Sequence, residues 1–504
     1  MQGDRALGET NNTTFPLTFN RSIKIESRPE KLSANAGAEL LRELDDRFDY
    51  TRFLSSKLRD SRRQDLITHP LNEMLRTRLY LIAMGLPDQD DADYFRHDPS
   101  FRLAVSERKG DAPLRIPDDE QTPDGLSSQP TQSRFIKMLS TDSNKKILRE
   151  GLIQTVGAGI RATRGHRHQN ATLDIDFFPV TVYGEQAGST YSGYYRSRAY
   201  NVLACMLSET SDFIDMKLFP GTTPPVNEVA EIVLPLVTWM EKEVCVTASV
   251  RGDAGMPAEE LLGPLDDHGN GYCFRIKTNS VLDDIAKPYV GRLEKRKGIN
   301  YEDYTFHELE YKAETWSRKR RTVLVVKRNP GELFADWFFL ITNWSEGQMP
   351  PGELLDFYRK RGIAENHFGE LKSDVLNGLP CTQRAKSRYQ LNEIKNPSPV
   401  RTDDEVFEAN ETTLLLFGYG YNLLNRTRHI AQKAMPIDRG PSASPRWGGW
   451  SIRRTRDRLL RVAARFSLHA RRVTMIIGEA SALLWNKVAP YFASTPFVTI
   501  TDTT

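Results

Sequence analysis

Acidic side chains occupy two apolar segments where such side chains seldom occur without a function. Asp174 and Asp176 lie within residues 172–180, which predict a strand, and Asp253 directly follows another predicted strand, residues 244–250. Carboxylates are depleted in strands and are rarely buried. Side chains alternate along a strand, so Asp174 and Asp176 share one face. Asp253 stands at the carboxyl end of its strand, the edge at which open α/β sheets bind ligands.

A third acid belongs to a predicted helix, residues 353–376. Tyr358, Arg361, Glu365 and Lys372 are spaced at i, i+3, i+7 and i+14, which places them along one stripe of that helix. Such a helix is also compatible with an ordinary exposed surface, with Arg361 and Glu365 forming an i, i+4 ion pair. An acid in a strand, an acid at a strand end and an acid on a later helix are much less expected together by chance.

These residue types suit metal-assisted phosphoryl transfer. Carboxylate oxygens can hold a pair of Mg²⁺ ions, which activate a water or a 3′-hydroxyl and stabilise the leaving oxygen. Arg361 would hold a phosphate as a fork and Lys372 as a point charge. The chemistry that these residues favour is therefore cleavage or joining of a phosphodiester backbone.

The elements that must position these residues form an α/β arrangement. Residues 31–85 have helical periodicity, and residues 128–135 look like a capped helix start whose Arg134 suits a DNA contact or a solvent-exposed cap. Strands are predicted at 172–180, 194–207, 213–218 and 244–250, with a helix at 226–242 between the last two. Residues 271–344 form a second strand-rich block, and helices are predicted at 411–434, 451–468 and 480–491.

Composition excludes several classes of protein. The 504 residues predict about three domains with sizeable cores, and the four cysteines have no CxxC spacing, which argues against a disulfide scaffold or a thiolate zinc site. No apolar segment reaches the roughly 18 residues of a membrane span, and the N-terminus lacks the apolar core of a secretory signal. These features predict a soluble, intracellular protein without a membrane partner.

The net charge of +3 conceals a basic segment. Residues 426–472 contain 13 Lys and Arg side chains against two Asp side chains. Such a concentration is typical of a surface that binds the phosphate backbone of nucleic acids, although a solvated helix face is an equal alternative.

The spacing of Tyr358, Arg361, Glu365 and Lys372 matches without gaps the Y-R-E-K signature of bacterial insertion-sequence transposases of the DDE class. Neighbouring segments agree: residues 365–372 resemble the family's E-N-x-I-K-E-L-K, and residues 128–135 resemble the S-Q-P-T-L-S-R segment of the group-1 DDE transposases. Residues 250–255, 183–186, 193–195 and 421–424 resemble further family segments. The resemblance extends from about Asp93 to Arg472.

The resemblance implies an RNase H-like catalytic core, interrupted by a β-rich insertion and flanked by helical N-terminal and C-terminal regions. The expected boundaries are 1–150 for a helical region that binds DNA ends, 165–265 and 346–435 for the two parts of the core, 266–345 for the insertion, and 436–504 for a basic helical region. The implied metal ligands are Asp176, Asp253 and Glu365, with two Mg²⁺ or Mn²⁺ ions. Tyr358, Arg361 and Lys372 correspond to DNA-end contacts.

Two positions leave alternatives open. The family usually has a small hydroxyl residue shortly after its first acid, whereas Phe177 and Phe178 follow Asp176, so Asp174 remains an alternative first acid. In relatives, an aromatic side chain of the insertion can stack on a base flipped out of the transposon end. Trp316 is the residue proposed for that role, and a packed Trp on a β-hairpin is the more frequent alternative.

The function predicted from the resemblance is that of a bacterial cytoplasmic transposase. It would bind the terminal inverted repeats of its element as a homodimer, cleave the double-stranded DNA, and transfer the 3′-hydroxyl ends to target DNA. Two other functions stay open on the same scaffold: a domesticated DNA-binding protein that does not cut, and an RNase H-like DNA nuclease that cuts without joining strands.

Overall fold

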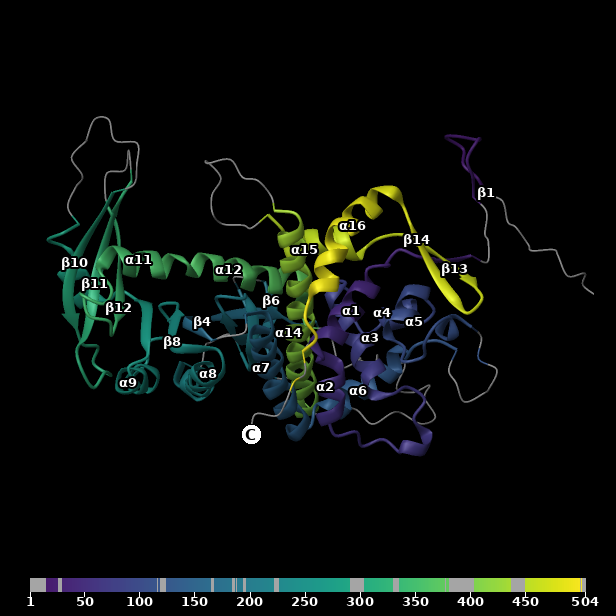
Figure 1. Ribbon diagram of the computed structural model, residues 1–504. Coiled ribbons are helices and arrows are strands. Elements are labelled where there is room, and N and C mark those ends of the chain that lie inside the picture. Colours follow the sequence, from purple (N-terminus) through teal and green to yellow (C-terminus); the bar gives the residue numbers. More distant parts are fainter. Residues whose placement is uncertain are drawn as a thin grey trace, which may run out of the picture.

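The computed structural model is elongated, with a large sheet at one end and a helical region at the other (Figure 1). It describes residues 15–25, 30–115, 117, 124–164, 167–183, 186, 188–193, 196–221, 226–290, 303–329, 335–376, 378–379, 403–436, 449–498 and 500. The family-like positions 184–185 and 194–195 lie outside the described residues.

The large sheet has nine strands in the order β10-β11-β12-β9-β8-β4-β6-β5, with β7 also paired to β6. Its strands are β4 (His168–Thr181), β5 (Thr190–Ser192), β6 (Ser197–Leu207), β7 (Asp212–Phe219), β8 (Cys245–Gly252), β9 (Gly271–Ile276), β10 (Asp303–Tyr311), β11 (Arg320–Arg328) and β12 (Asp336–Thr342). β4 pairs antiparallel with β6 and parallel with β8, and β8 pairs parallel with β9. The four strands predicted between residues 172 and 250 are thus confirmed, with shifts at their ends.

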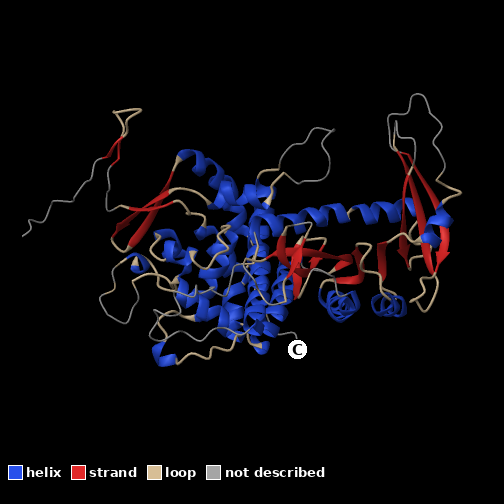
Figure 2. Ribbon diagram, turned by 180° about the vertical axis from the view of Figure 1, so that it is seen from behind, coloured by secondary structure: helices blue, strands red, loops and turns tan. Residues whose placement is uncertain are grey.

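Helices cover both faces of this sheet. On one face, α14 (Asp403–Ala434) packs against β7, and on the other face α8 (Val229–Glu243) and α9 (Glu259–His268) pack against β8 and β9. Figure 2 shows α8 and α9 side by side along the sheet. Because both faces are covered, the central strand β4 is buried over most of its length, as sandwiched strands require.

The predicted insertion continues the sheet of the core. β9 lies inside the range 266–345 but pairs with β8, and β12 then pairs with β9 to extend the same sheet. The added part is the antiparallel set β10-β11-β12, which begins after β9. The sequence alone does not predict that β9 joins the sheet of the core, because the residues of a strand do not show which strands it pairs with.

The N-terminal region is helical, as predicted. Its helices are α1 (Ala38–Phe48), α2 (Tyr50–Lys57), α3 (Leu71–Ala83), α4 (Asp91–Phe95), α5 (Pro99–Val105), α6 (Gln129–Leu139) and α7 (Asp142–Arg164). Several of them pack against α14, which joins this region to the sheet in one continuous apolar core.

The C-terminal region is not wholly helical, which corrects the prediction of a helix over 451–468. Only α15 (Ile452–Thr455) and the π-helical turn η5 (Arg456–Leu460) are helical there, and β13 (Ala464–His469) follows. β13 pairs with β14 (Arg472–Ile477) and with β3 (Lys31–Ser33) in a three-stranded sheet. Residues 464–469 alternate between buried and exposed side chains, a period of two that a search for helical spacing overlooks. The last predicted helix is present as α16 (Glu479–Ser494).

None of the helices in the described part of the chain is long and apolar enough to cross a membrane. Three of the four cysteines, Cys205, Cys245 and Cys273, are buried free thiols in the large sheet, and Cys381 lies outside the described residues.

Candidate active site

The helical segment that carries the Y-R-E-K residues runs across the large sheet as one rod (Figure 1). It comprises α11 (Pro351–Arg359), α12 (Arg361–Glu370) and the π-helical turn η4 (Leu371–Leu376). Pro350 and Pro351 begin the rod, because proline suits the first helical turn. Phe368 of α12 packs against Phe178 of β4, with ring centroids 6.3 Å apart. Phe178 and Asp176 share one face of β4, so this packing presents α12 to the acidic residue.

The three acids of the sequence prediction surround a single guanidinium. An Nη2 atom of Arg361 lies 3.3 Å from Asp176 Oδ1 and 3.9 Å from Asp253 Oδ2, and its Nη1 atom is paired with Glu365. The Arg361 side chain is only 11% exposed, whereas Asp253 and Glu365 are about half exposed. Side chains from β4, from the end of β8 and from α12 thus meet at one place.

Asp176 is the most enclosed of these acids, with its side chain 18% exposed. Burial raises the pKa of Asp176 to about 6, since the charged form loses hydration. The charge of Arg361 opposes the increase, and the nearby charges of Asp253 and Glu365 add to it. The charged form of a carboxyl that shares a site with two others is stabilised when a cation lies beside it.

Asp174, the alternative first acid, has a different partner. It is fully buried and forms a two-pronged ion pair with Arg251, whose Nε lies 2.6 Å from Oδ1 and whose Nη2 lies 2.8 Å from Oδ2. Arg251 is the register partner of Asp174 on the neighbouring strand β8. Its Nη1 atom also donates to the backbone carbonyl of Phe357 on α11, at 2.5 Å. This geometry assigns Asp174 a structural part: with Arg251 it fixes α11 on the sheet.

A second buried ion pair fixes the other end of the rod. Glu370 accepts from Arg428 of α14 at 3.0 Å and from the backbone N–H of Ile452 at 3.0 Å. Tyr421 and His367 hydrogen-bond to each other inside the same cluster. Sequence reasoning did not single out Glu370, Arg428 or Arg251. The sequence could have indicated this ion pair through Glu370, which lies on the side of α12 away from Glu365 and Lys372. If that side is buried, its carboxylate requires a partner.

Two pockets border the acidic cluster, one on each side of Glu365. A pocket of about 1050 Å³ lies towards β10–β12 and contains Asp253, Tyr358 and Arg361, together with Arg275 and Lys327 of the sheet. The pKa of Tyr358 is raised to about 12, chiefly by burial, so its hydroxyl stays protonated at neutral pH.

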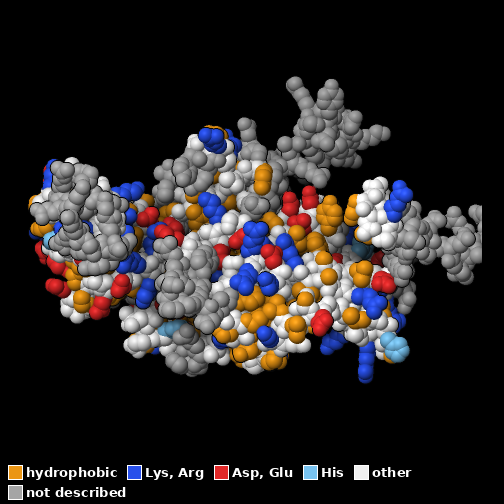
Figure 3. All heavy atoms as spheres, turned by 90° about the horizontal axis from the view of Figure 1, so that it is seen from above, with side chains coloured by type: hydrophobic (Ala, Val, Ile, Leu, Met, Phe, Trp, Pro, Cys, Tyr) orange, Lys and Arg blue, Asp and Glu red, His pale blue; other side chains and the backbone are white. Residues whose placement is uncertain are grey.

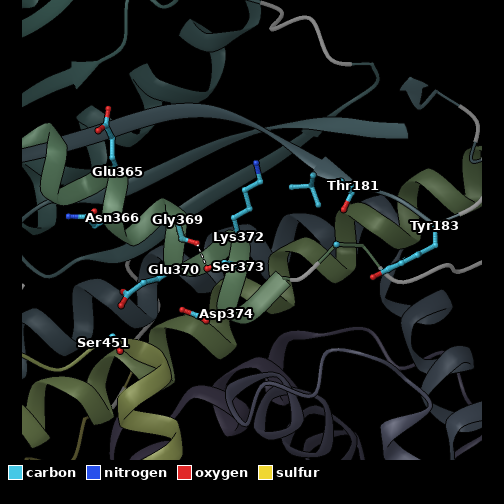
Figure 4. A pocket seen from close by; sticks show the side chains of 12 residues that line it. Thr181, Tyr183, Glu365, Asn366, Gly369, Glu370, Lys372, Ser373, Asp374 and Ser451 are labelled. Carbon is cyan, nitrogen blue, oxygen red and sulfur yellow. Dashed lines mark hydrogen bonds between the residues drawn. The ribbon is translucent and has the colours of Figure 1, made fainter. Parts of the chain in front are cut away.

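The other pocket, of about 730 Å³, contains Glu365 and Lys372 together with Thr181 and Tyr183 from the end of β4. In Figure 4, Glu365 and Lys372 point to one side of the rod and Glu370 to the other. Partial burial lowers the pKa of Lys372. Glu365 lines both pockets, which we together call the trough.

Two residues named by the sequence analysis lie elsewhere. Arg134 is on α6, where it donates to Thr131 Oγ1, and it does not line the trough. Trp316 is 5% exposed and packs against Tyr311 and Arg320 in the core beneath the sheet. A ring packed in this way is not available to a base, so the structure favours the packing alternative, and base stacking by Trp316 stays a prediction without support.

The basic segment 426–472 divides into buried and exposed arginines. Arg426, Arg428 and Arg456 are buried, the first two paired with Asp212 and Glu370 and the third donating to the backbone carbonyl of Asp374. The exposed arginines are Arg453, Arg454, Arg458, Arg461, Arg465, Arg471 and Arg472. Viewed from above, Lys and Arg side chains gather near the middle of the molecule, over the region of α15 (Figure 3).

The chemistry of the three acids fits a hard divalent cation such as Mg²⁺ or Mn²⁺, because all of them offer carboxylate oxygens. As they stand, however, Arg361 lies between them. Within the described ranges, no three His, Cys, Asp or Glu side chains are close enough together to hold a metal ion. Metal binding at this place therefore requires the guanidinium of Arg361 to move away from the carboxylates.

Comparison with known proteins identifies the family of the chain. Residues 15–483 match the family model described as "Transposase DDE domain group 1". No curated protein matches the chain significantly. Among solved structures, a piggyBac transposase synaptic complex with hairpin DNA resembles it at 10% identity with a TM-score of 0.38, covering 93% of this chain and 86% of that chain. Because the family model spans nearly the whole sequence, the chain belongs to the group-1 DDE transposase family.

Proposed function

We propose that this protein is a DNA transposase that binds terminal inverted repeats, cleaves the element's ends and transfers the 3′-hydroxyl ends to target DNA. The observation that carries the proposal is the meeting of Asp176, Asp253 and Glu365 around one guanidinium. Three carboxylates from separate elements repel one another unless a cation lies between them. In the structure this cation is the guanidinium of Arg361, and the proposal is that metal ions take its place.

The arrangement of strands supports an RNase H-like core. Three antiparallel neighbours, β7, β6 and β4, are followed by β8 and β9, both parallel to β4. This is the strand order of RNase H-like domains. Asp176 lies within β4, the central strand of that order, Asp253 follows the end of β8 beside it, and Glu365 is on α12, the helix after the insertion.

Two Mg²⁺ or Mn²⁺ ions, when bound to the three acids, would activate the attacking hydroxyl and stabilise the leaving oxygen. Arg361 would then turn to a DNA phosphate, to which its planar fork is suited, while Lys372 contacts the backbone in the adjoining pocket. Tyr358, protonated at neutral pH, would donate a hydrogen bond on the other side of the acids. The chain's own residues thus hold the DNA strand across the trough.

The substrate of this proposal is double-stranded DNA, both at the element's ends and in the target. Two ends must be cut and joined together, so we also propose a homodimer with one acidic cluster for each end.

End-specific cleavage tests the proposal. The protein would be incubated with Mg²⁺ and a plasmid that carries the inverted repeats flanking its own gene. We expect breaks at the outer boundaries of the repeats, and no such breaks in a plasmid with scrambled repeats. Binding to the repeats without any break would instead indicate a DNA-binding protein that does not cut.

The raised pKa of Asp176 predicts a pH dependence of metal binding. Below its pKa of about 6, Asp176 is protonated and cannot act as a metal ligand. We expect Mn²⁺ affinity, measured by calorimetry, to be constant above pH 7 and to fall about tenfold for each pH unit below 6. Asp176→Asn should bind Mn²⁺ more weakly and lack this step, whereas an unchanged affinity in the unmodified protein from pH 7.5 to 5 would contradict the assignment.

A further inference from the structure

The three-stranded sheet β14-β13-β3 has one covered face and one open face. Phe466, Met475 and Ile477 belong to the covered face, which packs on the helical region with Leu114 and Trp485. The open face has exposed side chains at alternate positions of the three strands: Leu32, Arg465, Ser467, His469, Arg472, Thr474 and Ile476. The register confirms that these residues are neighbours, because it pairs Arg465 with Ile476, Ser467 with Thr474 and His469 with Arg472.

We infer that this open face, termed here the hairpin face, binds the backbone and groove of the element's duplex DNA. The inference rests on the proposed function, in which DNA is the substrate. It adds a contact surface on a sheet where the sequence predicted only helices.

The charge of the hairpin face fits this partner. Arg465 and Arg472 stand on the face, and Arg471 stands at the turn between the strands. Within the described part of the chain, none of these three forms an ion pair, whereas the buried arginines Arg426 and Arg428 each have a carboxylate. Counterions are condensed along the phosphates of DNA, and unpaired Arg side chains that contact the phosphates release them, which favours binding.

Basic residues of another segment extend the same edge. A Cβ atom on Gly110 would lie 3.2 Å from the carbonyl oxygen of Arg471, so the loop that contains Arg108 and Lys109 adjoins the turn. Lys109 is exposed, and Arg108 is partly exposed. The positive charge therefore continues from the hairpin onto the helical region beside it.

The shape of the hairpin also fits a DNA groove. The major groove admits a two-stranded β-ribbon, and β-ribbon proteins read DNA from such a ribbon. The chain turns between the strands through Ala470 and Arg471, both with positive φ (49° and 61°), a turn whose twist matches that of the paired strands. The hairpin lies at the margin of the helical end (Figure 1), where a duplex can reach it. Arg, Ser, Thr and His side chains can all hydrogen-bond to phosphates or base edges.

The test measures DNA binding by the full chain, without Mg²⁺ so that no cutting occurs. Fluorescence anisotropy would report the affinity for a duplex with one inverted-repeat end at several salt concentrations. For Arg465→Gln combined with Arg472→Gln, we expect about tenfold or greater loss of affinity at 100 mM salt. The slope of log affinity against log salt should decrease by about two, since each lost phosphate contact removes roughly one unit.

The matched control changes two cations elsewhere that are also exposed but already paired. Lys146→Gln with Lys287→Gln removes two positive charges, as the hairpin variant does. Lys146 pairs with Glu150 and Lys287 with Asp284. This control variant should leave the affinity within about twofold. A hairpin variant with unchanged affinity and slope would overturn the inference. A hairpin variant that no longer forms a dimer but binds DNA with normal affinity per protomer would also overturn the inference. It would indicate that the hairpin face is an interface between two copies of the chain.

Failure of the hairpin inference differs from failure of the proposed function. If the hairpin variant binds and cleaves DNA like the unmodified protein, only the hairpin inference is wrong. If the unmodified protein neither binds nor cleaves the repeats, the proposed function is wrong as well.

Discussion

Asp253→Asn is expected to reduce end cleavage by about 1000-fold or more while leaving DNA binding unchanged. Asp253 stands at the end of β8, and its carboxylate is one of the three that face Arg361. An amide in its place removes a negative ligand of the metal, and a loss of ~4 kcal/mol in transition-state stabilisation corresponds to about a thousandfold in rate. Cleavage of labelled repeat ends in Mg²⁺ measures the rate.

The control for this result is a carboxylate on the same rod that is paired with another side chain. Asp356 of α11 is about three-quarters exposed, lies 3.9 Å from Nη1 of Arg359, and lines the larger pocket. Asp356→Asn should cleave at a rate within about threefold of the unmodified protein. Equal cleavage rates for Asp253→Asn and Asp356→Asn would show that Asp253 is not part of the active site.

Arg251→Leu is expected to lower the free energy of unfolding by about 3–5 kcal/mol, because it leaves Asp174 as an uncompensated buried charge. It also removes the hydrogen bond to the carbonyl of Phe357, which holds α11 on the sheet. The midpoint of urea unfolding, followed by the fluorescence of the sheet's aromatic residues, measures the effect.

An exposed pair offers the control, since Arg63 is 74% exposed beside Asp65 and Arg63→Leu should change stability by less than about 1 kcal/mol. The double variant Asp174→Asn with Arg251→Gln replaces the ion pair by neutral side chains that can hydrogen-bond to each other, with Gln shorter than Arg. It should recover most of the stability and keep measurable end cleavage. Complete loss of cleavage in a folded double variant would mean that Asp174, and not Asp176, is the first acid.

The pair of aspartates shows how far the sequence can determine this site. Alternation along β4 puts Asp174 and Asp176 on one face, but only the register with β8 shows that Asp174 meets Arg251. That register depends on a partner strand about 75 residues later in the chain. The residues themselves therefore limit the first acid to two positions, and the contacts in the fold, Asp174 with Arg251 and Asp176 with Arg361, are the reason that we propose Asp176.

The extent of the helical segment that carries the Y-R-E-K residues was predictable, because the sequence has helical character over residues 353–376. Its anchoring was not, since the ion pair between Glu370 and Arg428 joins segments that are 58 residues apart. The basic segment 426–472 illustrates a similar limit. Composition counts Arg428 and Arg465 alike, although Arg428 is buried in an ion pair and Arg465 is exposed on a strand.

Strand transfer is the most direct test of the central claim that Asp176, Asp253 and Glu365 form the site of a transposase. A labelled duplex ending in the precut 3′-hydroxyl of the inverted repeat would be mixed with the protein, Mg²⁺ and a supercoiled target plasmid. We predict labelled end joined to the plasmid by the unmodified protein, and none by Asp176→Asn, Asp253→Asn or Glu365→Gln. Cleaved repeats that are never joined would identify a nuclease, and joining that survives these three changes would contradict the site.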